Sequence, residues 1–205
     1  MNPLFLSIDG CDGTGKSTQL DLLAQWLTSR GREVLTCRDP GSTPLGEEVR
    51  GLLLNRTDLH IHRRSEMLLY MAARSQLVEE VIRPALSEGK TVVSDRFLLA
   101  NVVYQGYGGG LDVETLWEVG RIATDAVFPH LVLLLDMPSG AAAARLRRSL
   151  DRMELEGDDF HARVRDGFLA EASRRPERIR VIDAARPVDE VHAAVREAVL
   201  PLLES

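Results

Sequence analysis

Residues 10–17 constrain this chain more than any other stretch, because they read Gly-Cys-Asp-Gly-Thr-Gly-Lys-Ser and match the pattern G-x-x-x-x-G-K-S/T. The apolar run 4–8 precedes them, and leucines at helical spacing follow. Glycines let the backbone turn its N–H groups onto phosphate oxygens, and the start of a helix adds the positive end of its dipole. A chance glycine-rich turn is the alternative, and the flanking strand and helix patterns argue against it.

The motif gives its residues separate tasks. Lys16 is expected to reach the β- and γ-phosphates of a nucleoside triphosphate, and Ser17 to place its hydroxyl on Mg²⁺. The rest of the loop is expected to surround the phosphates with backbone N–H groups. The triphosphate-binding candidates are Gly10, Cys11, Asp12, Gly13, Thr14, Gly15, Lys16, Ser17 and Thr18.

The composition predicts one globular domain spanning residues 1–205, since 44% of the residues are hydrophobic and 27% are charged. No apolar run approaches the ~20 residues of a membrane-spanning helix. Asp9 interrupts the first apolar run early, which argues against a signal peptide. Cys11 and Cys37 suggest no disulfide framework, so we expect free thiols and a cytoplasmic protein.

The net charge of −6 argues against a broad nucleic-acid-binding surface. An anionic ligand must therefore be held by local clusters of positive charge. Of the 25 basic residues only Lys16 and Lys90 are lysines. The arginine excess can be a compositional bias, so each arginine needs a positional argument.

Short apolar runs alternate with helical patterns along the whole chain, which predicts an α/β fold with a parallel sheet and helices on both faces. The longest helical pattern, 63–87, places Leu68 with Met71 on its apolar face and Pro84 near its last turn. The closing pattern, 188–203, begins its apolar face at Val188. The five expected strands are 4–8, 33–37, 91–94, 131–135 and 179–182.

Two strand ends carry arginines. Arg38 begins a Pro-Gly turn after the second strand, and Asp95-Arg96 follows the third. Ligands of open α/β sheets bind at the carboxyl ends of strands, so both arginines can meet a phosphate, and Asp95 can bind magnesium. An exposed turn arginine and a surface ion pair are the alternatives.

Tyr70 and Arg74 share one side of the 63–87 helix, since they lie four residues apart. They can hold a base between an aromatic ring and a guanidinium group, although a packed tyrosine beside a surface arginine fits the spacing equally well. Residues 145–158 mix arginines with carboxylates. This pattern is typical of a solvated helix, or of a lid that brings arginines to a transferring phosphate.

A phosphate-binding loop alone does not separate the classes that share it. A GTPase needs Asn/Thr-Lys-x-Asp, and Lys90 is followed by Thr91 and Val92. A nucleic-acid motor would be larger or carry a basic track. A small kinase with an arginine-rich lid fits better, with a binding-only protein as the alternative.

Further groups of residues follow the phosphate-binding loop in order. The loop itself reads Gly10-x-Asp12-Gly13-x-Gly15-Lys16-Ser17-Thr18. The others are Arg38-x-Pro40-Gly41, Leu-Leu-Tyr70-Met-Ala-Ala-Arg74, Asp95-Arg96, Asn101-x-x-Tyr104-Gln105-Gly106 and Leu150-Asp-Arg152. Together these groups resemble the thymidylate kinase family over essentially the whole chain. The resemblance implies a P-loop NTPase fold with a mobile lid, and ATP-dependent, in-line phosphorylation of dTMP to dTDP for dTTP biosynthesis.

The resemblance also implies roles for single residues. Lys16 would be catalytic and Arg96 both catalytic and, with Arg38, a ligand of the dTMP phosphate. Asp12 would approach the sugar hydroxyl, and Tyr104 would crowd the position of a ribose 2′-OH. On the base side, Tyr70 would stack on thymine, Arg74 would bind its carbonyl edge, and Asn101 and Gln105 would contact the nucleotide.

The family places a catalytic arginine in the phosphate-binding loop or in the lid, and residues 11–14 contain no basic side chain. The resemblance therefore assigns this role to the lid, with Arg148 and Arg152 as candidates and Arg145 and Arg147 behind them. It further implies Mg²⁺ on Ser17 and Asp95, and a homodimer. Another nucleoside monophosphate kinase is the remaining alternative.

Overall fold

The computed structural model describes residues 2–204, apart from 57, 144, 146–151 and 154. Within these residues, five parallel strands form one sheet in the order β2-β3-β1-β4-β5, which confirms the expected architecture. Ile8 pairs with Asp95 on one side and Leu133 on the other, so β1 lies in the middle. The strands are β1 (Phe5–Asp9), β2 (Val34–Arg38), β3 (Thr91–Asp95), β4 (Leu131–Asp136) and β5 (Ile179–Asp183).

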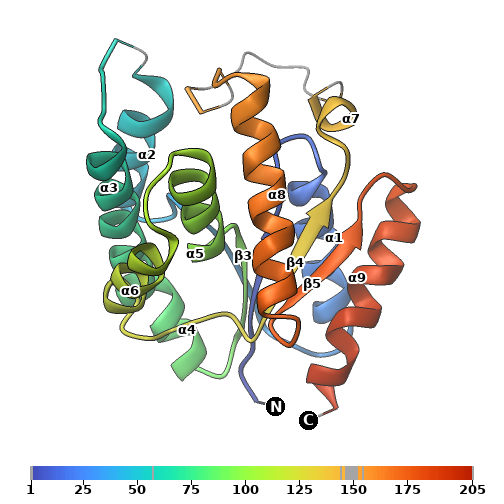
Figure 1. Ribbon diagram of the computed structural model, residues 1–205. Helices are drawn as coiled ribbons and strands as arrows, with labels where there is room; N and C mark the ends of the chain where they lie inside the picture. Colours follow the sequence, from blue (N-terminus) through green and yellow to red (C-terminus); the bar gives the residue numbers. More distant parts are fainter. Residues whose placement is uncertain (1, 57, 144, 146–151, 154, 205) are drawn as a thin grey trace.

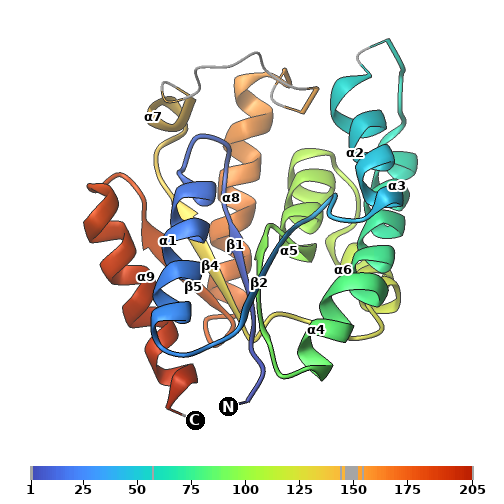
Figure 2. The same ribbon diagram turned by 180° about the vertical axis from the view of Figure 1, so that it is seen from behind.

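Helices cover both faces of the sheet, as Figures 1 and 2 show from opposite sides. One face carries α1 (Lys16–Ser29) and α9 (Val188–Leu203). The other carries the remaining long helices and two π-helical segments, η1 and η2. They are α2 (Pro44–Asn55), α3 (Arg63–Leu77), η1 (Val78–Ile82), α4 (Arg83–Ser87), α5 (Leu98–Asn101), η2 (Val102–Gly108), α6 (Val113–Ala123) and α8 (Asp158–Arg174); the short α7 (Ser139–Ala143) follows β4.

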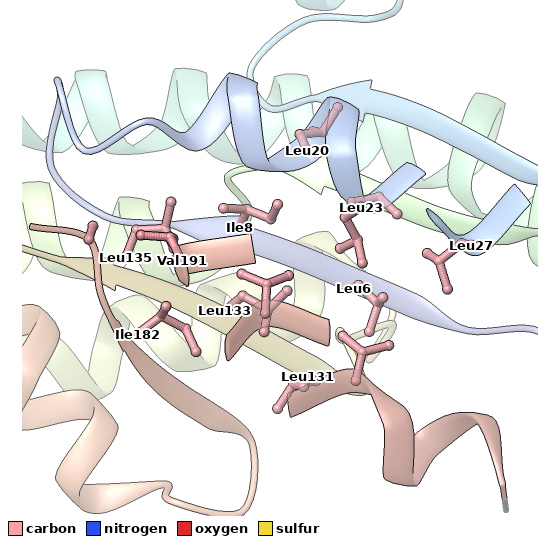
Figure 3. Packing of buried hydrophobic residues seen from close by; sticks show 14 of the residues in the cluster. Leu6, Ile8, Leu20, Leu23, Leu27, Leu131, Leu133, Leu135, Ile182 and Val191 are labelled. Carbon is pink, nitrogen blue, oxygen red and sulfur yellow. The ribbon is translucent and has the colours of Figure 1, made fainter. Parts of the chain in front are cut away.

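The alternation of side chains along the central strands builds a core on each face. Leu6 and Ile8 are fully buried against leucines of α1 and β4, as Figure 3 shows. Phe5, the residue before Leu6, points to the opposite face and packs edge-on against Phe97 at 4.9 Å. Burial of each such side chain contributes about 1.5–3 kcal/mol, so the strand that carries the phosphate-binding loop is firmly anchored.

The face expected for the 63–87 helix is wrong at one residue. Leu68 is 52% exposed, whereas Met67 and Met71 are buried. The helix buries the side that carries residues 67, 71 and 74. It then continues into the wider, π-helical η1, so a constant spacing of 3.6 residues per turn does not describe the whole segment. Pro84 lies at the start of α4, near the last turn as expected.

Val188, the first residue of α9, is also 52% exposed and does not join the apolar face expected for residues 188–203. The buried face begins at Val191, three residues further along the helix. Over the described residues, no helix is long and apolar enough to cross a membrane.

Candidate active site

The phosphate-binding loop takes a backbone path that only glycine permits. Gly10 has φ 140°, and a Cβ there would lie 2.4 Å from the Leu135 carbonyl oxygen. Gly13 has φ 84°, and its Cβ would meet the Ala142 carbonyl oxygen at 2.1 Å. Gly15 ends the loop in a left-handed conformation as the N-cap of α1. The glycines of the motif therefore let the loop pack against β4 and α7.

Lys16 lies buried beneath this loop. Its Nζ donates to the carbonyl oxygens of Gly10 at 3.2 Å and Cys11 at 2.8 Å, and it lies 3.4 Å from an Asp12 carboxylate oxygen. Burial, with the Arg96 charge nearby, lowers the pKa of Lys16, and the Asp12 charge opposes this. The ammonium group is thus held where the motif predicts phosphate binding.

A cavity of about 620 Å³ opens beside the loop. Cationic side chains from separate parts of the fold surround it, and the oxygen-bearing side chains of Asp12, Ser17, Thr18, Asp39 and Asp95 line it as well. Burial, together with the charges of Arg38 and Arg96, lowers the pKa of Arg50, which shows that cations are concentrated here. The cations are Lys16, Arg38, Arg50, Arg96 and Arg145. Such a cavity is suited to a polyanion.

Arg96 is the centre of a second cluster. It adopts a φ of 66°, a conformation that costs about 1–3 kcal/mol and often marks a functional site. Its guanidinium donates to the Gly10 carbonyl at 3.0 Å and to the Asp12 carboxylate at 2.6 Å. It also lies over the Tyr104 ring at 5.1 Å. The strand end after β3 is therefore tied directly to the phosphate-binding loop.

Asp12 receives a further hydrogen bond, from the Tyr104 hydroxyl at 3.1 Å. Burial by itself would raise the pKa of Asp12, but the charges of Arg96 and Lys16 outweigh it and hold the pKa well below its usual range. Burial raises the pKa of Tyr104 well above its usual value. At neutral pH Asp12 is therefore an ionised carboxylate that accepts this hydrogen bond, and Tyr104 is a neutral phenol that donates it.

A smaller cavity of about 100 Å³ adjoins the first. Four residues line both cavities: Asp12, Asp39, Arg50 and Arg96. The rest of its wall contains most of the residues expected to bind the acceptor nucleotide, from α3, α5 and η2. These are Tyr70, Arg74, Asn101, Tyr104 and Gln105.

Arg74 is not the surface arginine of the alternative interpretation, because it is 1% exposed. Its Nε donates to the Asp39 carboxylate at 2.5 Å, and one terminal nitrogen donates to the Asn101 side-chain oxygen at 2.9 Å. The ring of Phe97 lies 5.6 Å from the guanidinium carbon. A buried guanidinium held by these contacts forms an ordered part of the wall.

Arg38 lines the larger cavity, but not the smaller one. Its side chain is 46% exposed, and one guanidinium nitrogen contacts both carboxylate oxygens of Glu47, at 2.9 and 3.0 Å. Glu47 is on α2, so a phosphate bound by Arg38 would share this guanidinium with it.

Of the predicted lid residues, Arg147, Arg148, Leu150, Asp151 and Glu154 lie outside the described residues. Arg145 lines the larger cavity and donates to the Ala184 carbonyl at 3.2 Å. Arg152 has a different position: its Nε donates to the Leu53 carbonyl at 2.7 Å, and a terminal nitrogen donates to Glu66. The structure therefore ties Arg152 to the C-terminus of α2 and to α3.

Three residues of the site escaped the sequence interpretation. Asp39 and Arg50 line both cavities, and Glu66 is fully buried behind the smaller one. Glu66 carried a usable signal, because it precedes Tyr70 and Arg74 at four-residue spacing on the same helix side. Asp39 stood next to the predicted Arg38, whereas Arg50 had no distinguishing sequence context.

The parallel sheet has a phosphate-binding loop after its central strand. A cation-lined cavity beside that loop adjoins a second cavity walled by an aromatic ring, a guanidinium and two amides. Together these features define the class: a P-loop phosphotransferase. The family model for thymidylate kinase matches residues 8–195. The chain belongs to the thymidylate kinase family. This family phosphorylates dTMP to dTDP with ATP, so the protein is a kinase. The match to the family confirms the predicted family, fold and activity.

Individual relatives agree with this family. A thymidylate kinase of Rhodopirellula baltica is 50% identical over 91% of this chain and 76% of its own length. One from Clavibacter michiganensis is 46% identical over 96% of this chain and 94% of its own. The crystal structure of thymidylate kinase from Ehrlichia chaffeensis superimposes with a TM-score of 0.79 at 30% identity, covering 97% of this chain and 99% of that one.

Proposed function

We propose that this protein binds ATP along residues 10–18 and dTMP in the smaller cavity, and that Arg96 acts on both. The observation that carries this proposal is the junction of the two cavities, whose shared residues include Asp12 and Arg96. One cavity offers a phosphate-binding loop, and the other offers Tyr70 with a buried guanidinium. A phosphorylated acceptor in the second cavity would therefore meet a triphosphate in the first.

The transfer needs no strong general base, because the acceptor phosphate is already an anion. A dTMP phosphate oxygen forms a bond to the γ-phosphorus of ATP, and the bond from that phosphorus to the β–γ bridging oxygen breaks. ADP leaves with the bridging oxygen. Catalysis then depends on alignment and on neutralising charge. Lys16 at the start of α1, Arg38 at the end of β2 and Arg96 directly after β3 would supply this charge.

The smaller cavity supports the proposed roles on the nucleotide side. Tyr70 supplies a stacking face, and Arg74, Asn101 and Gln105 supply polar groups for the base edge. Tyr104 lines the smaller cavity and hydrogen-bonds Asp12, and its ring would exclude a ribose 2′-OH there.

Asp12 would accept a hydrogen bond from the sugar hydroxyl. It can do so at neutral pH because Arg96 and Lys16 keep its pKa low despite its burial.

Ser17 and Asp95 are proposed to hold Mg²⁺ with the triphosphate. Both line the cavity that contains Lys16, and hydroxyl and carboxylate oxygens suit this hard cation. Among the described residues, no group of three or more His, Cys, Asp or Glu side chains is placed to hold a metal. The triphosphate would therefore have to supply further oxygens. When bound, Mg²⁺ would neutralise charge on the phosphates.

The lid proposal retains Arg148 and Arg152 as the arginines that act on the transferred phosphate. The contacts of Arg152 with Leu53 and Glu66 give it a second proposed task, which is to anchor the lid to α2 and α3.

Family resemblance supports three further proposals: a single domain over residues 1–205, a homodimer and a cytoplasmic location. Sedimentation velocity of the purified protein tests the dimer.

The substrate assignment is tested by ATP-dependent phosphorylation of dTMP, dUMP, UMP, CMP and dGMP, assayed side by side. We expect the highest kcat/KM for dTMP. Preference for CMP or UMP would assign the protein to another monophosphate specificity, and nucleotide binding without turnover would make it a binding protein. Lys16→Met, expected to lower turnover at least ~100-fold because it removes the phosphate-loop charge, controls for contaminating kinases.

A further inference from the structure

A short turn joins β2 to α2 (Figure 2), and its contacts hold Arg38 at both the backbone and the guanidinium. The Arg38 backbone N–H donates to the Ser42 hydroxyl oxygen at 2.8 Å. One terminal nitrogen of the guanidinium contacts both carboxylate oxygens of Glu47, at 2.9 and 3.0 Å. The Ser42 backbone N–H donates to one of these oxygens at 2.7 Å, so the two partners of Arg38 are also bonded to each other. We refer to Arg38, Ser42 and Glu47 as the Arg38 clamp.

The carboxylate of Glu47 lies directly over the backbone of this turn. Gly41 has φ 138°, and a Cβ there would lie 2.6 Å from a Glu47 carboxylate oxygen and 3.1 Å from the Arg38 Nε. The missing side chain at position 41 therefore lets the carboxylate and the guanidinium meet above it. The hydrogen bonds from the Ser42 N–H and from Arg38 lower the pKa of Glu47, so Glu47 is an anion at neutral pH.

The contact with Glu47 leaves most of the guanidinium available to a ligand. A guanidinium has five N–H donors. Within the part of the chain that the structure describes, the Arg38 side chain donates through one terminal nitrogen alone, and only to Glu47. Arg38 lines the larger cavity together with Lys16 and Arg96. An anion in that cavity can therefore take the remaining donors of Arg38 while Glu47 stays in place.

Holding Arg38 in advance should favour binding of an anion. An arginine loses rotamer freedom when it binds a phosphate, and this loss opposes binding unless the side chain is already ordered. The Arg38 side chain is 46% exposed, so packing only partly restrains it. Glu47 is 48% exposed, so water screens the repulsion between its carboxylate and a bound phosphate. We therefore expect the ordering by Glu47 to outweigh its repulsion.

This inference rests on the proposed function, in which Arg38 binds the phosphate of dTMP. We propose that Glu47 is a positioning residue for that phosphate. It orients the Arg38 guanidinium at the larger cavity before the nucleotide arrives, and it does not touch the nucleotide itself. Its effect on binding therefore depends on the phosphate and on Arg38, and not on the base.

Thymidine and dTMP differ only in the phosphate, so comparing their Kd values isolates the role of Glu47. Glu47→Gln keeps the shape of the side chain, but only one of its two terminal atoms accepts hydrogen bonds, so it cannot reproduce all three contacts. Calorimetry should show dTMP bound at least ~5-fold more weakly and thymidine changed less than ~2-fold. Equal weakening of both ligands would assign Glu47 a purely structural role. Unchanged or tighter binding of dTMP would show that repulsion dominates, and either result overturns the proposal.

A double substitution tests whether Glu47 acts through Arg38. Arg38→Met removes the guanidinium, which leaves Glu47 nothing to position. Adding Glu47→Gln to Arg38→Met should then change the Kd for dTMP less than ~2-fold. A loss as large as in the presence of Arg38 contradicts the mechanism. Glu48→Gln, which removes the neighbouring exposed charge of α2, is the matched control and should not change this Kd; an equal effect there would make net charge the cause and overturn the proposal.

The outcomes separate this inference from the proposed function. If the unsubstituted protein binds dTMP no more tightly than thymidine, the proposed function fails. If it prefers dTMP and Glu47→Gln retains the full affinity, the inference alone fails. Should Glu47→Gln not fold, Glu47→Asp replaces it, because a carboxylate one methylene shorter cannot keep its contacts with both Arg38 and Ser42. The same selective loss of dTMP binding is required there, and an unchanged Kd overturns the inference.

Discussion

The buried ion pair between Arg74 and Asp39 gives the sharpest quantitative prediction. Both side chains are at most 2% exposed, and Nε lies 2.5 Å from the carboxylate oxygen. Arg74→Met keeps the aliphatic stem and removes the charge, so Asp39 stays buried without its cation. Removing one partner of such a pair costs about 3–5 kcal/mol of unfolding free energy. Urea unfolding at 25 °C and pH 7.5 measures this loss.

A matched double variant separates the unpaired charge from lost packing. Asp39→Asn/Arg74→Met contains no buried charge at these positions, so it should be more stable than Arg74→Met alone by about 1–3 kcal/mol. If the double variant is no more stable than the single one, the destabilisation does not come from an uncompensated Asp39. The reasoning would then be refuted.

The same variant has a defined pH dependence. Burial raises the pKa of Asp39, and Arg74 opposes this, so removing Arg74 raises the pKa further. Between the unfolded pKa of about 3.9 and the folded pKa, only the folded state binds this proton, so stability falls as pH rises. Arg74→Met should therefore lose less stability at pH 5 than at pH 7.5. Equal losses at both pH values would contradict the pKa argument.

Three further predictions address the proposed site. Gly13→Ala should weaken ATP binding at least ~10-fold by calorimetry, because its Cβ would lie 2.1 Å from the Ala142 oxygen at a φ of 84°; Gly51→Ala, with open space around its Cβ, is the control. Arg152→Ala should lower kcat at least ~10-fold and change the KM for dTMP less than ~3-fold, and an effect confined to KM would contradict its lid role. Tyr104→Ala should raise the kcat/KM for ribothymidine monophosphate relative to that for dTMP at least ~10-fold. Tyr104→Phe, which keeps the ring, should not change this ratio, and equal ratios for the two variants would exclude steric selection.

The parts of the fold that the sequence predicted are those set by local patterns. The phosphate-binding loop needs glycines at left-handed positions and a lysine at a fixed offset, and these were visible in residues 10–17. The strands β1, β3 and β4 were visible because central parallel strands, buried on both faces, are nearly continuous apolar runs. The edge strands β2 and β5 are shorter apolar patterns that are only partly buried.

Other features depend on packing and left no local signal. The expected burial of Leu68 was wrong, because the π-helical η1 changes the helical period and neighbouring helices choose the buried row. Arg50 lines both cavities only because α2 packs against α3. The contact of Arg152 with Glu66 joins residues 86 positions apart in the sequence. Spacing along one element cannot predict such contacts.

The sequence by itself determined the class of chemistry, since a phosphate-binding loop and its helix are encoded within a few consecutive residues. It also determined which residue types stand at the strand ends, such as Asp95 and Arg96. Only the tertiary structure decided what surrounds them. Arg74 became a buried partner of Asp39, and Glu66 became a buried acceptor for Gln105. Burial and hydrogen-bond direction arise between elements distant in sequence, and that is why folding was needed to decide them.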